Sequence, residues 1–290
     1  MKIGLTLPTM VAGLDRAAIL DWARRIDRGP FSTLAAGERI TFPNQELMVT
    51  MAAAAAVTER VRLAFTVVVL PMHSAVLIAK QVATLDVLSA GRVTLGVGVG
   101  GRDEDYRAVG APWAGRVKRL EEQVALMRRA WAGETVVPDA APVGPPPHQA
   151  GGPEILAGVL LPAAIRRASR WADGLCGFSF GPDAAEVGTA FTLAREAWRE
   201  RGRPAPRLVT SCWFALGPDG PTRMEAYVRR YLGTFGPDAA ASLATLCTTT
   251  SASALRDVCR QIADVGADEL LLVPTTADAD EVERVADLIG

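Results

Sequence analysis

Short apolar runs alternate along this chain with longer segments in which apolar residues recur every three or four positions. The short runs predict buried strands, and the periodic segments predict helices with one apolar face. Eight strands are predicted, at 3–7, 31–37, 62–70, 93–99, 154–157, 174–178, 208–216 and 269–273. Helices are predicted over about 14–26, 44–60, 74–90, 117–132, from 162 onward, and over about 187–201, 221–232, 238–247, 253–265 and 278–289.

Strand–helix units in series predict an α/β fold with a parallel sheet, and eight is the number of strands that closes a (β/α)₈ barrel. An open, doubly wound sheet is the alternative architecture. The segment 138–153 is so rich in proline and glycine that only a loop is expected there. We interpret it as an insertion before the fifth strand rather than a domain linker, because the same alternation resumes after it. Residues 1–290 are therefore expected to form one barrel domain.

Composition narrows the class of protein. Hydrophobic residues make up 49% of 290 residues, which is enough to fill the core of a large barrel, and the net charge is −1 with no block of like charges. This balance argues against nucleic acid or a membrane as partner and favours a small-molecule substrate. The N-terminus has the pattern of a strand rather than a signal peptide, so a cytoplasmic location is expected. The four cysteines are scattered and only two histidines occur, which predicts reduced thiols and no metal site.

The segment 96–101, GVGVGG, matches the pattern G-x-G-x-x-G. A dinucleotide site needs a helix that opens inside this motif, but no apolar-periodic helix is expected before about Arg116. We therefore reject a dinucleotide-binding interpretation. Two interpretations stay open: the glycines ease packing within the fourth strand, or Gly98, Gly100 and Gly101 leave room for a flat ring above the strand end, where barrel active sites lie.

Several motifs resemble the luciferase-like monooxygenase family. The core AKQVATLDVLSAGR at 79–92 is followed by LGVGVG at 95–100, and further matches are GER at 37–39, PAA at 162–164 and ADG at 172–174. Members of this family are (β/α)₈ barrels that use FMN or the deazaflavin coenzyme F-420. The chain is most similar to the actinobacterial F-420-dependent branch. The resemblance extends over essentially the whole chain.

This resemblance implies a cofactor site at the strand ends. The residues expected to contact the cofactor are Thr66, Val67, Gly98, Gly100, Gly101, Gly158, Val159, Leu160 and Ala163. A cis peptide bond is expected between Thr66 and Val67, and the cofactor phosphate is expected near the helix that Pro162 begins. The segment 158–162 lacks the hydroxyl side chains that relatives commonly place around this phosphate. Backbone N–H groups are therefore the donors expected there.

The catalytic candidates are Glu38, as a general acid, base or hydrogen-bond acceptor, and His73, as a pocket-lining residue. The main hypothesis is an oxidoreductase that transfers hydride between F-420 and a small organic substrate. An FMN-dependent monooxygenase and a non-catalytic flavin-binding barrel are the alternatives. The apolar faces of the helices at 44–60 and 74–90 also predict a homodimer.

Overall fold

The chain folds around a closed barrel of eight parallel strands, seen in a computed structural model that describes residues 1–290. Each strand pairs with the next in sequence, and the last pairs with the first, with Ile3 opposite Leu270. The strands are β1 (Lys2–Thr6), β2 (Thr33–Ala36), β3 (Arg62–Val69), β4 (Val93–Gly98), β5 (Glu154–Ala157), β6 (Gly174–Cys176), β7 (Arg207–Phe214) and β8 (Glu269–Pro274). The predicted (β/α)₈ barrel is confirmed, and the open doubly wound sheet is excluded.

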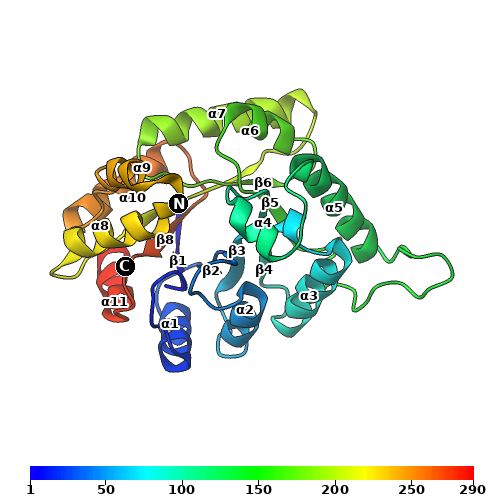
Figure 1. Cartoon of the computed structure of the whole chain (residues 1–290), viewed down its shortest axis with the longest axis horizontal. Coiled ribbons are helices and arrows are strands. Elements are labelled where there is room, and N and C mark those ends of the chain that lie inside the picture. The colour runs from blue at the N-terminus through cyan, green and yellow to red at the C-terminus, as the bar shows by residue number, and fades with distance from the viewer.

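The chain forms eleven helices, most of which surround the barrel on its outside (Figure 1). They are α1 (Arg16–Arg28), α2 (Leu47–Ala55), α3 (Ala75–Leu88), α4 (Asp103–Ala108), α5 (Arg116–Trp131), α6 (Pro162–Ala168), α7 (Ala184–Glu200), α8 (Gly220–Tyr231), α9 (Pro237–Ala244), α10 (Ala252–Asp264) and α11 (Asp280–Ile289). Short 3₁₀ turns lie at Leu70–Met72 and Gly233–Phe235. Local sequence explains several helix starts: Ser74 caps α3 through its side chain, and Pro162 stands in the first turn of α6.

The short helix α4 follows the glycine run, where no helix was predicted. Its six residues are too few to show apolar periodicity, and tertiary bonds to two of its side chains hold it in place. Asp105 accepts hydrogen bonds from the backbone and the hydroxyl of Thr41, and the Tyr106 hydroxyl donates to the carbonyl of Val99 at 2.6 Å. The strand before α4 belongs to a closed barrel, so the dinucleotide-binding interpretation remains rejected.

The core has two layers. The larger one lies between the strands and the ring of helices and contains 55 buried apolar residues. A smaller cluster fills the inside of the barrel with side chains from six strands: Ala35, Ala64, Leu156, Cys176, Val209 and Leu271. Because these side chains plug the barrel axis, a ligand can enter only above them, at the strand ends.

The family-like motif at 79–92 supports the lower end of the barrel, where β4 begins. Asp86 is fully buried and accepts two hydrogen bonds from Gln149, at 2.7 and 2.8 Å, which fasten the end of the long loop between α5 and β5. Arg92 donates to the carbonyls of Val61 and Thr58 at 3.0 and 2.8 Å. The predicted insertion before β5 is confirmed as this loop, which extends away from the barrel (Figure 1).

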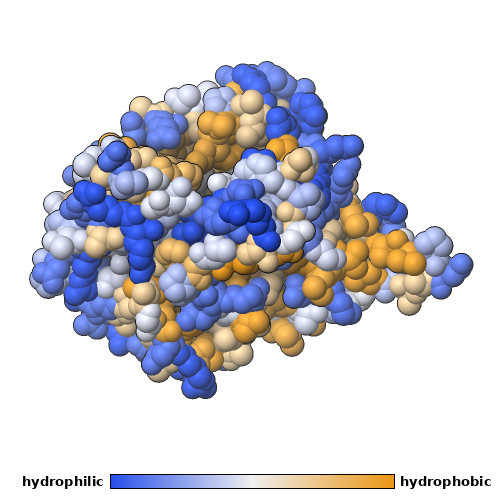
Figure 2. Space-filling view, viewed as in Figure 1, coloured by the Kyte–Doolittle hydropathy of each residue, from blue (hydrophilic) through white to orange (hydrophobic).

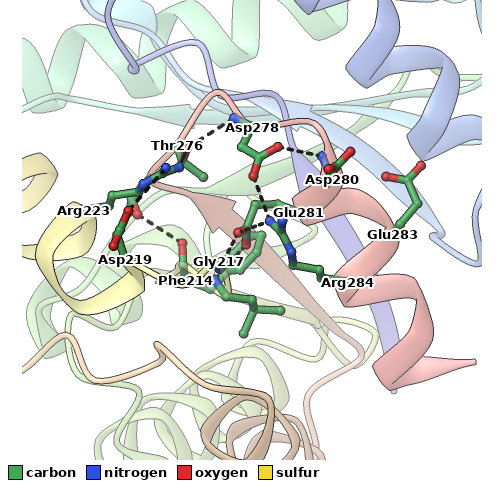
Figure 3. A network of polar contacts seen from close by, with 12 residues as sticks. Phe214, Gly217, Asp219, Arg223, Thr276, Asp278, Asp280, Glu281, Glu283 and Arg284 are labelled. Carbon is green, nitrogen blue, oxygen red and sulfur yellow. Dashed lines mark hydrogen bonds and ion pairs between the residues drawn. The ribbon is translucent and has the colours of Figure 1, made fainter.

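Polar contacts tie together two loops at the upper end, beside β7 and β8 (Figure 3). The buried Glu281 carboxylate accepts from the backbone N–H groups of Leu216 and Gly217, at 2.8 and 2.7 Å. Arg284 bridges Glu281 and Asp278, at 2.8 and 2.9 Å. The segment between β7 and α8 is thereby fixed against α11.

The outer surface carries exposed apolar side chains on α2 and α3. Val49 is 70% exposed and Leu88 is 74% exposed, and Leu77 and Val87 accompany them. Figure 2 shows further apolar surface at the base of the long loop, bordered by hydrophilic residues.

No helix combines the length and apolar character needed to cross a membrane. The four cysteines are unpaired, and three of them are buried.

Candidate functional site

A cavity of about 320 Å³ opens at the carboxyl ends of the barrel strands, where it was predicted. Its size falls in the range of small-molecule sites, and most of its surface is apolar. Every strand end contributes to it. The lining residues are Thr6, Leu7, Pro8, Thr9, Met10, Gly37, Thr66, Val67, Gly101, Arg102, Gly158, Val159, Leu160, Cys176, Gly177, Phe178, Phe180, Ser211, Trp213, Tyr227, Tyr231, Leu232, Phe235, Val273 and Pro274.

Aromatic rings form one wall of the cavity. Trp213 contacts Phe178 and Tyr231, with ring centroids 4.7 and 5.5 Å apart, and Tyr227 stacks on Tyr231 at 5.8 Å. Tyr227 and Tyr231 are four residues apart on α8, so both rings leave the same face of the helix. Such a wall suits a flat, apolar ligand.

The opposite wall is formed by the irregular end of β3. The peptide bond between Thr66 and Val67 is cis, as predicted, and the pairing register of β3 with β4 shifts between Phe65 and Val68. Thr66 and Val67 both line the cavity. Glycine is needed next to them: a Cβ at position 158 would lie 2.6 Å from a methyl of Val67, and one at Gly37 would lie 2.8 Å from the carbonyl oxygen of Thr66.

The glycine run at the end of β4 serves two purposes. Gly98 does not line the cavity, and a Cβ there would lie 3.0 Å from Val67. Gly100 has a φ of 63° and packs against Val69. Gly101 lines the cavity, and a Cβ there would meet nothing within 4 Å. The first two glycines therefore allow close packing on β3, whereas the third leaves open space at the strand end.

The loop between β5 and α6 presents unpaired backbone donors. No acceptor within the protein bonds the N–H groups of Val159, Leu160, Leu161 and Ala163, whereas the N–H of Ala164 bonds the carbonyl of Leu161 at 2.9 Å. Val159 and Leu160 line both the main cavity and a second one of about 520 Å³ beside α7, which Phe178 also lines. Ala163 is exposed outside the main cavity. The two cavities therefore meet at the cofactor residues predicted on this loop.

Glu38 and His73 contact each other but do not line the cavity. His73 Nε2 lies 2.8 Å from Glu38 Oε1, and Glu38 Oε2 accepts the N–H of Val69 at 2.7 Å. Their side chains are 4% and 23% exposed, for Glu38 and His73 respectively. Burial opposes the charge on His73, but the hydrogen bond and the charge of Glu38 outweigh it and raise the pKa of His73. The pair braces the end of β3 from behind.

The ionisable groups that do line the cavity are Arg102, Cys176, Tyr227 and Tyr231. Burial raises the pKa of Cys176 to about 12 and also raises the pKa of Tyr227, so both groups keep their protons at neutral pH. Sequence reasoning did not identify Arg102, Tyr227 or Tyr231 as site residues. The i, i+4 spacing of the two tyrosines, and the position of Arg102 directly after the glycine run, were the available signals.

Comparison with known proteins agrees with this architecture. A family model described as luciferase-like monooxygenase matches residues 1–282. The uncharacterized protein Rv0940c of Mycobacterium tuberculosis is 35% identical over 198 residues, which cover 63% of this chain and 65% of that protein. The chain thus spans just under two thirds of the length of this curated relative.

Solved structures share the fold. An F420-dependent secondary alcohol dehydrogenase in complex with an F420-acetone adduct has a TM-score of 0.79 at 17% identity, covering 100% of this chain and 98% of that one. The oxygenating constituent of 3,6-diketocamphane monooxygenase from Pseudomonas putida, in complex with FMN, has a TM-score of 0.78 at 18% identity, covering 100% and 96%. At these identities the likeness shows the fold alone.

Proposed function

We propose that this chain, which belongs to the luciferase-like monooxygenase family of flavin- and deazaflavin-dependent oxidoreductases, transfers hydride between coenzyme F-420 and a small organic substrate. The observation that carries the proposal is the lining of the cavity, which is mostly apolar and aromatic and contains no carboxylate or imidazole. A site without an acid–base pair of its own depends on a bound cofactor for the reaction.

The residues present fit a flavin-like group. The cavity is bounded by the aromatic wall on one side and by Thr66 and Val67 on the other. The hydroxyl oxygen of Thr6 is buried in the cavity lining and has no hydrogen-bond partner, so it is free for a bound group. We infer that Thr66, Val67, Gly101, Gly158, Val159 and Leu160 border the ring, with Gly98 and Gly100 supporting them from behind.

The unpaired N–H groups of Val159, Leu160, Leu161 and Ala163 support the placement of the cofactor phosphate on the loop between β5 and α6. Backbone donors bind phosphate without the help of hydroxyl side chains. Their position between the two cavities also leaves space for a longer tail beside α7.

A bound deazaflavin supplies a hydride carrier that exchanges two electrons with the substrate. The chain's own contribution is to hold the reactants together and to exclude water. Trp213, Phe178 and Tyr231 form an apolar wall of the cavity, and Thr6 offers a hydrogen bond for orientation. The hydroxyl of Tyr227 and the thiol of Cys176 keep their protons at neutral pH, so they can donate hydrogen bonds but cannot act as general bases.

For Glu38 and His73 we propose a positioning role. General acid or base catalysis requires contact with the reacting atoms, and neither residue lines the cavity. Their contact with each other and with the N–H of Val69 holds the segment that carries Thr66 and Val67.

The test is direct binding of F-420, FMN and reduced FMN to the purified protein. We expect micromolar or tighter binding of F-420, and oxidation or reduction of the bound deazaflavin by a small alcohol or carbonyl compound. Tight binding of reduced FMN with oxygen consumption, and no binding of F-420, would instead establish the monooxygenase alternative. Binding of either cofactor without turnover across a panel of substrates would favour a non-catalytic barrel.

A further inference from the structure

Three arginines without a carboxylate partner gather at the edge of the cavity. Arg39 follows β2, Arg102 follows β4, and Arg230 lies on α8. Every hydrogen bond that their guanidinium groups donate goes to a backbone carbonyl: Arg39 and Arg102 donate to Tyr231, and Arg230 donates to Met10. Together they place three positive charges around one side of the cavity, and we call them the arginine cluster.

Arg39 is the most buried member. It is 7% exposed, and its Nε has no hydrogen-bond partner. Its guanidinium carbon lies 4.1 Å from the ring centre of Phe42 and 5.4 Å from that of Tyr231. Burial, and then the positive charge of Arg102, lower the pKa of Arg39. Two guanidiniums that repel each other beside a cavity are a favourable place for an anion.

Arg102 connects the cluster to the cavity, since it lines the cavity wall. Its guanidinium carbon lies 4.9 Å from the ring centre of Tyr231, and its buried Nε also lacks a partner. The contact with the ring holds the planar group in place, and the N–H donors that do not bond the carbonyl of Tyr231 are free for a carboxylate or phosphate.

Nearby carboxylates do not neutralise the cluster. Asp105 accepts the hydroxyl and N–H of Thr41, and Glu104 accepts the hydroxyl of Thr234 at 2.8 Å. The negative charges of Asp105 and Glu104 raise the pKa of Arg39. Burial and the positive charge of Arg102 lower it by more, so the pKa is lowered overall.

We propose that the cavity takes a substrate with an apolar body and an anionic oxygen group, a carboxylate or phosphate, which Arg102 binds directly and which the positive charge of Arg39 behind it attracts. The apolar body lies against Trp213 and Tyr231. The proposal rests on the proposed function only in treating this cavity as the substrate site.

The experiment compares probes of the same shape and different charge. Binding of 2-naphthoate, 2-naphthyl phosphate and neutral 2-naphthamide is measured by calorimetry for the parent, Arg102→Gln and Arg116→Gln. Arg116 is a matched control, because it stacks on Trp113 at 3.6 Å, has an unpartnered Nε and lies outside the cavity. We expect the parent and R116Q to prefer an anionic probe by about tenfold or more, and R102Q to lose that preference. Equal affinity of the parent for charged and neutral probes, or an unchanged preference in R102Q, overturns the proposal.

A second arm separates a substrate anion from the anionic tail of the cofactor. F-420 and a deazaflavin that lacks the phosphate and glutamate tail are titrated into the parent and R102Q. We expect R102Q to bind both as the parent does. If R102Q has a lower affinity than the parent for F-420 but not for the deazaflavin without the tail, the arginine cluster binds the cofactor tail and the substrate assignment is wrong. Because the naphthalene probes need no cofactor, loss of all cofactor binding with retained anion preference would refute the proposed function and leave this inference standing.

Discussion

Replacing His73 by glutamine tests the brace behind β3. Glutamine can place an N–H donor where Nε2 of His73 donates to Glu38, so the variant H73Q removes the positive charge and keeps a neutral hydrogen bond. The carboxylate of Glu38 is 4% exposed, and its oxygen lies 2.8 Å from Nε2 of His73. Solvent therefore screens the Glu38–His73 pair weakly, and the attraction between the carboxylate and the protonated imidazole contributes to stability.

The size of the stability loss in H73Q, and its change with pH, follow from the Glu38–His73 contact. A charged donor makes a hydrogen bond roughly twice as strong as a neutral one, so H73Q should lose about 1–2 kcal/mol of unfolding free energy at pH 6. The pKa of His73 is raised in the folded protein. A raised pKa gives stability that is fully present below the unfolded pKa of about 6.5 and is lost as the pH rises through the folded pKa. The difference between the parent and H73Q should therefore shrink toward pH 9.

The assay is equilibrium urea unfolding of the parent, H73Q and His148→Gln at pH 6, 7.5 and 9. His148 is the other histidine of the chain and lies in the long loop, so H148Q is the reference for loss of an imidazole. A difference between the parent and H73Q that stays constant or grows with pH would show that the Glu38–His73 contact is not an ion pair. The cofactor affinity of H73Q, measured in parallel, reports whether the brace positions Thr66 and Val67.

Three further outcomes are expected. Gly158→Trp should abolish F-420 or FMN binding, because the indole would occupy the cavity that Gly158 lines, and far-ultraviolet circular dichroism should show that the barrel is kept although Val67 must shift locally to admit the new Cβ; binding as tight as in the parent would place the phosphate elsewhere. Glu281→Gln should lower the unfolding free energy by about 2–4 kcal/mol in urea titrations, since the buried carboxylate satisfies two N–H groups and an arginine; no loss would mean that the network is dispensable. The double variant Val49→Asp, Leu88→Asp should convert a homodimer into a monomer in light scattering, because both side chains are more than two thirds exposed on α2 and α3; a parent that is monomeric at micromolar concentration would refute the dimer.

The sequence predicted the barrel because its signals are local and repeated. Runs such as 62–70 and 93–99 are apolar on both faces, as strands buried between a barrel interior and its helices must be. Caps such as Ser74 mark the helix starts directly. The helix α4 was missed because its stability comes from the contact of Asp105 with Thr41, 64 residues away in sequence, rather than from its own pattern.

The site was harder to predict because side-chain direction depends on tertiary packing. Thr66, Val67, Gly101, Gly158, Val159 and Leu160 were placed at the strand ends by the resemblance, and they line the cavity. The resemblance did not show which way the Glu38 side chain points. Its carboxylate accepts a hydrogen bond from the N–H of Val69 and does not line the cavity. Nor could pattern alone reveal that Arg39 and Arg102 share the carbonyl of Tyr231, since the three residues meet only in the closed barrel.

The motif at 79–92 has a consequence for how such barrels can be engineered. Asp86 and Arg92 secure the long loop and the neighbouring strand at the lower end of the barrel, whereas the cavity lies at the upper end. The motif at 79–92 therefore stabilises the fold of the barrel and says little about which reaction the cavity supports. Upper loops from a relative with another cofactor or substrate could be grafted above an unchanged lower half, and the chimera should keep its fold while it acquires the donor's specificity.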